Sequence, residues 1–251
     1  MNNPVLGAEN RPHLFENLFP HSIFLKYSSG QDGTMSFVHG SGSNVSENRR
    51  SFLEDSGVDA ARLVCARQVH GDTVACVSDA DAGRGADSPE SAFADTDALI
   101  TDRRRLALAI FTADCLPVFL YDPQKQVIGL AHAGWRGTKE NIAGKTVQAM
   151  MKQYDCRPGD IYAGFGPAIR GCCYRVGDEF KDRFESGLAQ KNGSLYLDLV
   201  KINTEQLLRR EIKRVNIFDS SICTFCANDG YFSYRRQGLS SGRGMAVLMI
   251  R

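Results

Sequence analysis

Three short, uninterrupted apolar runs lie close together in the middle of the chain, at residues 106–111, 118–121 and 127–131. Apolar runs of this length are typical of strands buried on both faces, and the Asp122-Pro123 turn after the second run favours strands over a buried helix. A sheet that is buried on both faces needs other layers above and below it. The runs therefore predict an α/β fold in which helices sandwich a mixed sheet.

Helical spacing of apolar residues appears directly after the third run. Ile142, Val147, Met150 and Tyr154 recur at near-helical intervals, which predicts a helix over residues 138–154 packed on the sheet. Similar reasoning predicts two further helices, one that starts near Ser46 and one at 203–214, and two further strands, at 161–163 and 245–250.

The 251 residues contain no internal repeat and no long linker. Two polar stretches, 40–44 and 79–95, are predicted to be surface loops, and neither is long enough to separate two domains. We therefore expect a single domain over residues 1–251, with a flexible N-terminal segment at 1–20.

The charge balance argues against several kinds of partner. Thirty basic and 29 acidic residues leave a formal charge of +1, which gives no overall electrostatic attraction for nucleic acids or anionic membranes. No apolar run approaches the roughly 20 residues that span a bilayer, and residues 1–16 lack the pattern of a secretory signal. We expect a cytoplasmic protein with no nucleic-acid or membrane partner, and a homodimer remains open.

Eight cysteines are present, and most are expected to be reduced structural thiols. Cys223 and Cys226 form a CxxC motif, which is half of a four-cysteine zinc site, but no second CxxC completes it. Cys172 and Cys173 are adjacent and poorly shaped for joint chelation. We therefore expect all four to be structural.

Candidate metal ligands follow or precede predicted strands in three segments that contain His70, Cys115 and His132. Adjacent strands lie about 4.8 Å apart, so side chains that leave the same sheet edge can converge on one ion. Two imidazoles and one thiolate around zinc leave a fourth position for water. The same atoms allow another interpretation, in which Cys115 is a nucleophile and His132 its base, as in a cysteine hydrolase.

A series of motifs, from about Ser36 to the C-terminus, resembles that of the YfiH/LACC1 family. In chain order the motifs are Gln-Val-His-Gly (68–71), Asp-Ala-Leu-Ile-Thr (97–101), Thr-Ala-Asp-Cys-Leu-Pro (112–117), His-Ala-Gly-Trp-Arg-Gly (132–137), Gly-Pro-Ala-Ile (166–169), Cys-Cys-Tyr (172–174), Phe-Ser-Tyr-Arg-Arg (232–236) and Gly-Arg (242–243). The family was long labelled polyphenol oxidase or laccase and is now described as multifunctional purine nucleoside enzymes.

The resemblance implies one YfiH-like α/β domain, related to the cysteine hydrolase-like fold, that binds zinc through His70, Cys115 and His132. It implies phosphorolysis of adenosine, inosine, guanosine and methylthioadenosine, together with deamination of adenosine. Copper-dependent phenol oxidation is the weaker interpretation, because three soft or borderline ligands do not make a multicopper cluster. An accessory role in peptidoglycan editing, also linked to the family, remains an alternative.

Five further side chains beside these motifs are candidates for substrate chemistry. Arg49, Arg136 and Arg235 are expected to bind phosphate, because guanidinium groups bind it in a bidentate manner. Asp114 is expected either to carry a proton or to orient an imidazole ligand, and its other possible role is to cap a turn. Gln68 is expected to hydrogen-bond the purine edge or the metal-bound water.

The loop after His132 contains the only tryptophan, Trp135, which either stacks on a base or packs as a lid. Gly134 and Gly137 are expected to permit a tight turn before a helix whose N-terminus offers amide donors to an anion. The chain departs from the family pattern at Val38-His39, which makes His39 an extra pocket candidate, and at Arg170-Gly171, which changes one loop and adds a charge.

Overall fold

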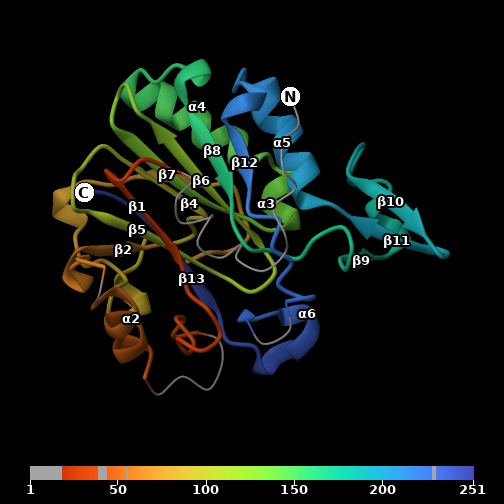
Figure 1. The fold of residues 1–251 in the computed structure, drawn as a ribbon, viewed down its shortest axis with the longest axis horizontal. Helices are drawn as coiled ribbons and strands as arrows, with labels where there is room; N and C mark the ends of the chain where they lie inside the picture. The colour runs from red at the N-terminus through yellow and green to blue at the C-terminus, as the bar shows by residue number, and fades with distance from the viewer. Residues whose placement is uncertain (1–18, 39–43, 55, 228–229) are drawn as a thin grey trace, which may run out of the picture.

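Two mixed sheets form the centre of the molecule in the computed structural model, which describes residues 19–38, 44–54, 56–227 and 230–251 (Figure 1). The larger sheet has the order β12-β8-β6-β7-β4-β3, and the smaller has the order β1-β13-β5-β2. The strands of the larger sheet are β3 (Val74–Cys76), β4 (Ala98–Thr101), β6 (Leu116–Asp122), β7 (Val127–Ala133), β8 (Tyr162–Phe165) and β12 (Ile217–Asp219). Those of the smaller are β1 (Ile23–Tyr27), β2 (Leu63–Cys65), β5 (Ala107–Thr112) and β13 (Gly244–Ile250).

The two sheets pack face to face, and their shared core explains the continuous apolar runs. In β5, Leu108 and Ile110 face the other sheet, whereas Ala107 and Ala109 belong to a second core on the outer face. Successive side chains of a strand point to opposite faces, so every position of a strand covered on both sides must be apolar. The α/β class is confirmed, and the sandwich holds two stacked sheets where one was expected.

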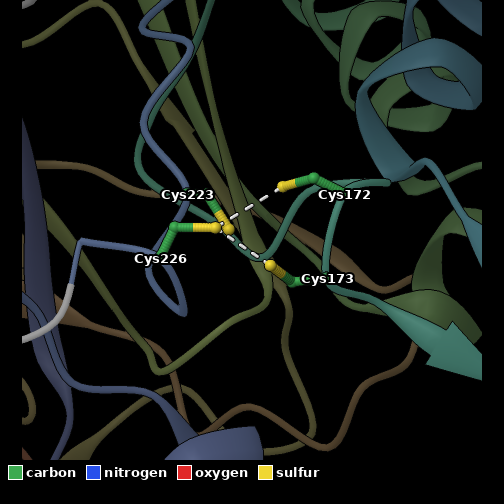
Figure 2. Close-up of side chains that lie close together, drawn as sticks. All are labelled: Cys172, Cys173, Cys223 and Cys226. Carbon is green, nitrogen blue, oxygen red and sulfur yellow. Dashed lines mark hydrogen bonds between the residues drawn. The ribbon is translucent and has the colours of Figure 1, made fainter.

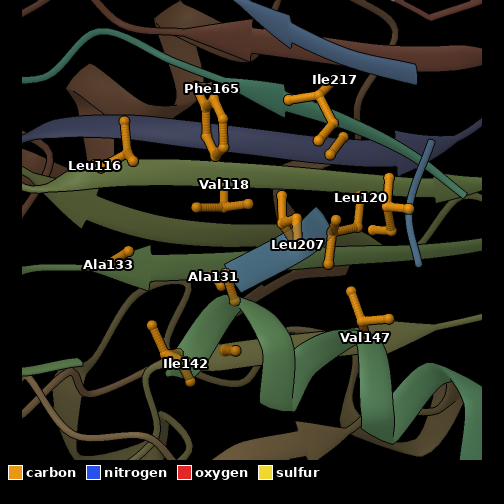
Figure 3. Close-up of a cluster of buried hydrophobic side chains, with 14 of the residues drawn as sticks. Leu116, Val118, Leu120, Ala131, Ala133, Ile142, Val147, Phe165, Leu207 and Ile217 are labelled. Atoms are coloured by element: carbon orange, nitrogen blue, oxygen red, sulfur yellow. The ribbon is translucent and has the colours of Figure 1, made fainter. Parts of the chain in front are cut away.

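Helices cover the outer faces of both sheets. On the larger sheet, α4 (Ile142–Tyr154) and α5 (Leu199–Arg209) pack through side chains such as Val147 and Leu207 against Leu120 and Phe165 (Figure 3). On the smaller sheet, Phe52 of α2 (Val45–Glu54) lies in the outer core. Burial of these apolar faces fixes the strands, and therefore the loops at their ends.

The predicted helix at 138–154 is divided in two. A short helix, α3 (Trp135–Lys139), precedes α4, and Asn141 between them has a left-handed backbone with φ of 63°. The helix predicted at 203–214 begins earlier, because the Asp198 side chain accepts a hydrogen bond from the Lys201 amide at 3.0 Å and caps α5.

The remaining described elements are small. A three-stranded sheet contains β9 (Arg175–Val176), β10 (Leu188–Lys191) and β11 (Ser194–Leu197), and α6 (Tyr234–Gln237) precedes β13. The predicted loop at 79–95 carries only short 3-10 turns. Three predictions fall on residues outside the described part of the chain. They are the predicted loop at 40–44 for its residues 40–43, the pocket candidate His39, and most of the N-terminal segment at 1–20. Among the described residues, no helix has the length and apolar character needed to cross a membrane.

Candidate active site

One edge of the larger sheet brings the predicted ligands together. β4 and β6 begin at this edge and β7 ends there, with Pro117 of β6 opposite His132 of β7. Cys115 directly precedes β6 and therefore lies beside the end of β7. Asp97 directly precedes β4, and its carbonyl accepts a hydrogen bond from the His132 amide at 2.8 Å.

The ligand atoms of His70, Cys115 and His132 all lie within 4.8 Å of one another. The two imidazole rings are 4.8 Å apart between centroids and nearly perpendicular, at 73°. The predicted convergence of these three side chains is confirmed. We call them the His-Cys-His group; two nitrogen donors and one sulfur donor suit a borderline divalent ion such as zinc.

Asp97 holds two of these residues in place. Its buried carboxylate accepts a hydrogen bond from Nδ1 of His132 at 2.8 Å, which leaves Nε2 of that ring to face the other ligands. The same carboxylate accepts the backbone amides of Val69, His70 and Gly71 at 3.1, 3.0 and 2.7 Å. This fixes the loop in which His70 has a left-handed backbone, with φ of 61°. Carboxylates that orient ligand imidazoles in this way are common in metal sites.

The sulfur of Cys115 and the ring of His132 shift each other's protonation. Burial raises the pKa of the Cys115 thiol, but the charge of His132 and hydrogen bonds from both imidazoles outweigh it and bring the pKa to about 6. Burial lowers the pKa of His132, while the Cys115 charge and the Asp97 hydrogen bond raise it to about 9. A thiolate therefore exists at neutral pH, the form that binds metals.

Gly134 is required by close approach and not by a turn. A Cβ at this position would lie 2.9 Å from Cδ2 of His70 and 3.0 Å from Sγ of Cys115, and the backbone φ is an ordinary −70°. A Cβ on Gly137 would lie 2.8 Å from the carbonyl oxygen of Gly71. These two glycines are therefore needed because the ligand loops pack closely against them, and not because they form the turn that we expected.

A cavity of about 460 Å³ opens beside the His-Cys-His group. Three of the predicted substrate residues, Asp114, Arg136 and Arg235, line it. Its wall also contains residues to which sequence reasoning gave no role or only an uncertain one, namely Phe111, Trp135, Tyr174, Tyr234 and Arg243.

Asp114 is anchored in the wall of this cavity. Its Oδ1 accepts a hydrogen bond from the Thr224 hydroxyl at 2.7 Å, and its Oδ2 accepts one from the Arg235 amide at 2.6 Å. The carboxylate that orients His132 is Asp97, so this part of the expectation for Asp114 is wrong. The alternative role as a proton carrier stays a prediction.

Arg49 and Gln68 do not line this cavity but a smaller neighbouring one of about 190 Å³. The buried Arg49 guanidinium donates to the carbonyl oxygens of Met35, Gly85 and Ala86, at 2.8, 2.7 and 2.6 Å. The Gln68 amide donates to the Phe111 carbonyl at 2.8 Å and accepts its N–H at 2.7 Å. Both side chains are committed to backbone groups, so their predicted substrate roles are corrected to structural ones.

Three important residues were missed in the sequence. Asp97 begins one of the recognised motifs, but a carboxylate before a strand has no distinctive spacing. Arg243 and Tyr174 also belong to motifs, and each comes next to the cavity through the packing of loops distant in sequence.

Arg170, where the chain departs from the family pattern, pairs with Asp219 at 2.8 Å and stays outside the cavity.

Comparison with known proteins identifies the family of this chain. The family model described as multi-copper polyphenol oxidoreductase laccase matches residues 33–251. Purine nucleoside phosphorylase YlmD of Geobacillus stearothermophilus is 36% identical over 214 residues, which cover 82% of this chain and 78% of the relative. Adenosine deaminase RL5, from an unknown prokaryotic organism, is 33% identical over 208 residues, 79% of each chain. The crystal structure of Bacillus licheniformis hypothetical protein YfiH superposes with a TM-score of 0.84 at 32% identity, covering 91% of this chain and 93% of that one. The chain therefore belongs to the YfiH/LACC1 family of laccase-like proteins.

Proposed function

We propose that this protein is a zinc-dependent purine nucleoside enzyme. It cleaves adenosine, inosine, guanosine and methylthioadenosine with phosphate, and it deaminates adenosine to inosine. The observation that carries the proposal is the cavity in which the His-Cys-His group lies beside arginine side chains. The names of two relatives, a purine nucleoside phosphorylase and an adenosine deaminase, support both reactions.

The cavity has the size and lining that a nucleoside needs. Its volume of about 460 Å³ falls within the range of about 300–1,000 Å³ usual for small-molecule pockets. The aromatic rings of Phe111, Trp135 and Tyr174 provide apolar faces for a flat purine base. Trp135 itself packs against Phe180 at 5.1 Å between centroids, which holds it in the wall.

The His-Cys-His group fits zinc, because it offers two imidazole nitrogens and a thiolate and leaves room for a fourth ligand. When bound, zinc supplies Lewis-acid activation of water for attack on C6 of adenosine. Asp97 keeps the ring of His132 in the orientation in which Nε2 faces Cys115 and His70 and would be free to hold an ion. Asp114, at the cavity wall, would take up a proton at its carboxylate and return it to the amino group that leaves C6.

Phosphorolysis uses the positively charged part of the wall. Arg136 and Arg235 hold phosphate against C1′ of the ribose, and Arg243 lies in the same wall. An oxygen of hydrogen phosphate forms a bond to C1′ as the bond from C1′ to the purine nitrogen breaks, and the base takes up the proton that the phosphate loses. These arginines balance the charge of phosphate in a cavity that is partly closed to water.

A cysteine hydrolase is the second candidate, and the shifted pKa values of Cys115 and His132 favour it. A nucleophilic thiolate beside an imidazolium is the pair that such enzymes use. However, His70 also hydrogen-bonds the same sulfur, and a third ligand is what a metal site requires. An oxidase with several copper ions has less support, since these three ligands hold a single ion.

The deciding experiment incubates zinc-loaded protein with adenosine, with and without phosphate, and identifies the products by chromatography. We expect adenine and ribose 1-phosphate only when phosphate is present, and inosine in its absence. Removal of the metal with a chelator should abolish both reactions, and added zinc should restore them. Full turnover by metal-free protein would contradict the zinc mechanism and favour the hydrolase.

A further inference from the structure

A second group of potential metal ligands lies outside the His-Cys-His group. Two of its members lie in the loop between β8 and β9 and two in the loop that follows β12. Their sulfur atoms all lie within 4.8 Å of one another, and Figure 2 shows the four side chains pointing toward a common centre. We call this group the four-cysteine cluster; it consists of Cys172, Cys173, Cys223 and Cys226.

The cluster completes a motif that the sequence left unfinished. Cys223 and Cys226 have the spacing of half a structural zinc site, and no second CxxC exists in the chain. The adjacent pair Cys172 and Cys173, which looked poorly shaped for joint chelation, supplies the two missing sulfur atoms. The structure therefore brings together four sulfur atoms where the sequence indicated two separate pairs of structural thiols.

The Cys172–Cys226 distance fits sulfur atoms that share one ion, and all four cysteines are free thiols and not disulfides. Zinc–sulfur bonds of about 2.3 Å in a tetrahedron place the sulfur atoms about 3.8 Å apart. Sγ of Cys226 lies 3.7 Å from that of Cys172 and 2.9 Å from that of Cys173. Cys172 also contacts both Cys173 and Cys223. A disulfide joins two sulfur atoms at about 2.05 Å, whereas here each of these sulfurs borders more than one other.

Backbone amides favour the ionised form of one member. The backbone amides of Cys226, Arg170 and Phe225 hydrogen-bond the sulfur of Cys223. Amide donors of this kind stabilise a thiolate, the form that binds a cation.

The two loops are also held together by contacts that do not involve sulfur. Arg170 of the first loop donates to the carbonyl oxygen of Ile222 in the second loop at 2.9 Å. The Thr224 amide donates to the Ala168 carbonyl at 3.1 Å. The fold therefore brings the four thiols together by its own hydrogen bonds, so an ion would enter a preformed site.

We propose that the four-cysteine cluster is a second metal site, which binds one zinc ion through four thiolates. With all four positions taken by protein, the site is structural and leaves no open position for catalysis. It fastens together two loops that reach the cavity, because Tyr174 follows the first cysteine pair and Thr224, between the other two cysteines, donates to Asp114. The site thus stabilises the loops that position Tyr174 and Asp114 in the cavity wall.

The test counts zinc in protein that is produced with added zinc and kept under reducing agent. Native mass spectrometry and elemental analysis should find two zinc ions per chain. The double variant Cys223→Ser/Cys226→Ser should retain one, and Cys115→Ser should retain the other. Cys76→Ser removes an exposed cysteine that hydrogen-bonds Tyr154 away from both groups, so this matched control should retain two.

Cobalt(II) provides a second readout that does not depend on the stability of the double variant. Cys115→Ser protein loaded with cobalt should show the strong thiolate-to-cobalt charge-transfer absorption of four sulfur ligands. No zinc in Cys115→Ser, or an equal zinc content in the unaltered chain and in Cys223→Ser/Cys226→Ser, would overturn the proposal. So would disulfides between the two loops in zinc-replete protein. Because no substrate is used, these results are independent of the proposed nucleoside chemistry.

Discussion

Asp97 and His132 are joined by a hydrogen bond of 2.8 Å between Oδ1 and Nδ1, and both side chains are buried. The bond fixes which ring nitrogen of His132 faces Cys115 and His70. The other contacts of Asp97 are amides of the loop that carries His70, so one carboxylate positions ligands from two distant segments.

Replacement of Asp97 by asparagine should weaken metal binding. The change keeps the shape of the side chain but removes its charge and sets an NH₂ group against backbone donors. We expect zinc affinity to fall about 10- to 100-fold, the usual effect of losing such an orienting group. Competition with a chromophoric chelator measures this affinity. Asp178→Asn, an exposed member of a surface ion pair, is the control, and equal affinities in the two variants would contradict the role of Asp97.

Metal-free protein should contain an unusually acidic thiol at Cys115. Its pKa of about 6 lies below the value of about 8.5 for a free cysteine, so the thiolate persists as the pH falls and is lost near pH 6. The stability that this ionisation contributes is present above the free value and disappears as the pH falls through about 6. The rate of iodoacetamide alkylation, measured against pH, should rise with a midpoint near 6. His132→Asn should move the midpoint toward that of a free thiol, and an unmoved midpoint would argue against the pairing.

Arg136→Gln should separate the two proposed reactions. The Arg136 guanidinium lies over the Trp135 ring at the cavity wall, and its loss removes a charge from the expected phosphate position. We expect the KM for phosphate to rise about tenfold or more, since a charge-assisted hydrogen bond contributes roughly 1.5–3 kcal/mol. Adenosine deamination, which uses no phosphate, should be nearly unchanged. Initial rates of both reactions, with Arg103→Gln as an exposed control, provide the measurement.

Arg49→Met should affect folding and not phosphate binding. Three carbonyl groups lose their donor, and the ring contacts of the guanidinium with Phe37 and Phe111, both at 4.5 Å, are lost as well. Unsatisfied buried polar groups predict a loss of roughly 2–4 kcal/mol in the free energy of unfolding. Urea denaturation measures it. If the free energy of unfolding is unchanged and the KM for phosphate rises, Arg49 binds substrate and the structural role is wrong.

Gly134→Ala should disturb the ligands more than the fold. The added methyl carbon would lie 2.9 Å from Cδ2 of His70 and 3.0 Å from Sγ of Cys115. Both distances are too short, so at least one of these two side chains must move. We expect a loss of zinc affinity with a smaller change in melting temperature. A Cβ added at Gly230 would have no described residue within 4 Å, so Gly230→Ala is a matched control that should bind zinc normally.

The strands were predictable because each depends on a strong local pattern, whereas the His-Cys-His group was assigned as a metal site through the resemblance to the YfiH/LACC1 family. Runs such as 118–121 are apolar at every position since both faces are covered, and Cys115 and His132 flank such runs. The break between α3 and α4 was not predictable in this way. There the Asn141 side chain occupies the space where a Cβ on Gly144 would lie, at 2.5 Å, a contact that periodicity does not encode.

The arginines and the cysteine pairs show a second limit. Arg49 and Arg136 look alike in sequence, but one guanidinium is buried among carbonyls while the other reaches the cavity. Cys172 and Cys226 are 54 positions apart, and only the folding of two loops brings their sulfur atoms together. Patterns within one segment predicted elements well, whereas partners from different segments required the structure.

The anchoring of His70 and His132 by Asp97 has a consequence for how the protein would acquire and lose a metal ion. Because a carboxylate and four hydrogen bonds keep the ligand loops in position, the empty and loaded forms should share one backbone arrangement. We therefore expect metal exchange to proceed on the folded chain, at a rate governed by access through the cavity and by pH, without a refolding step.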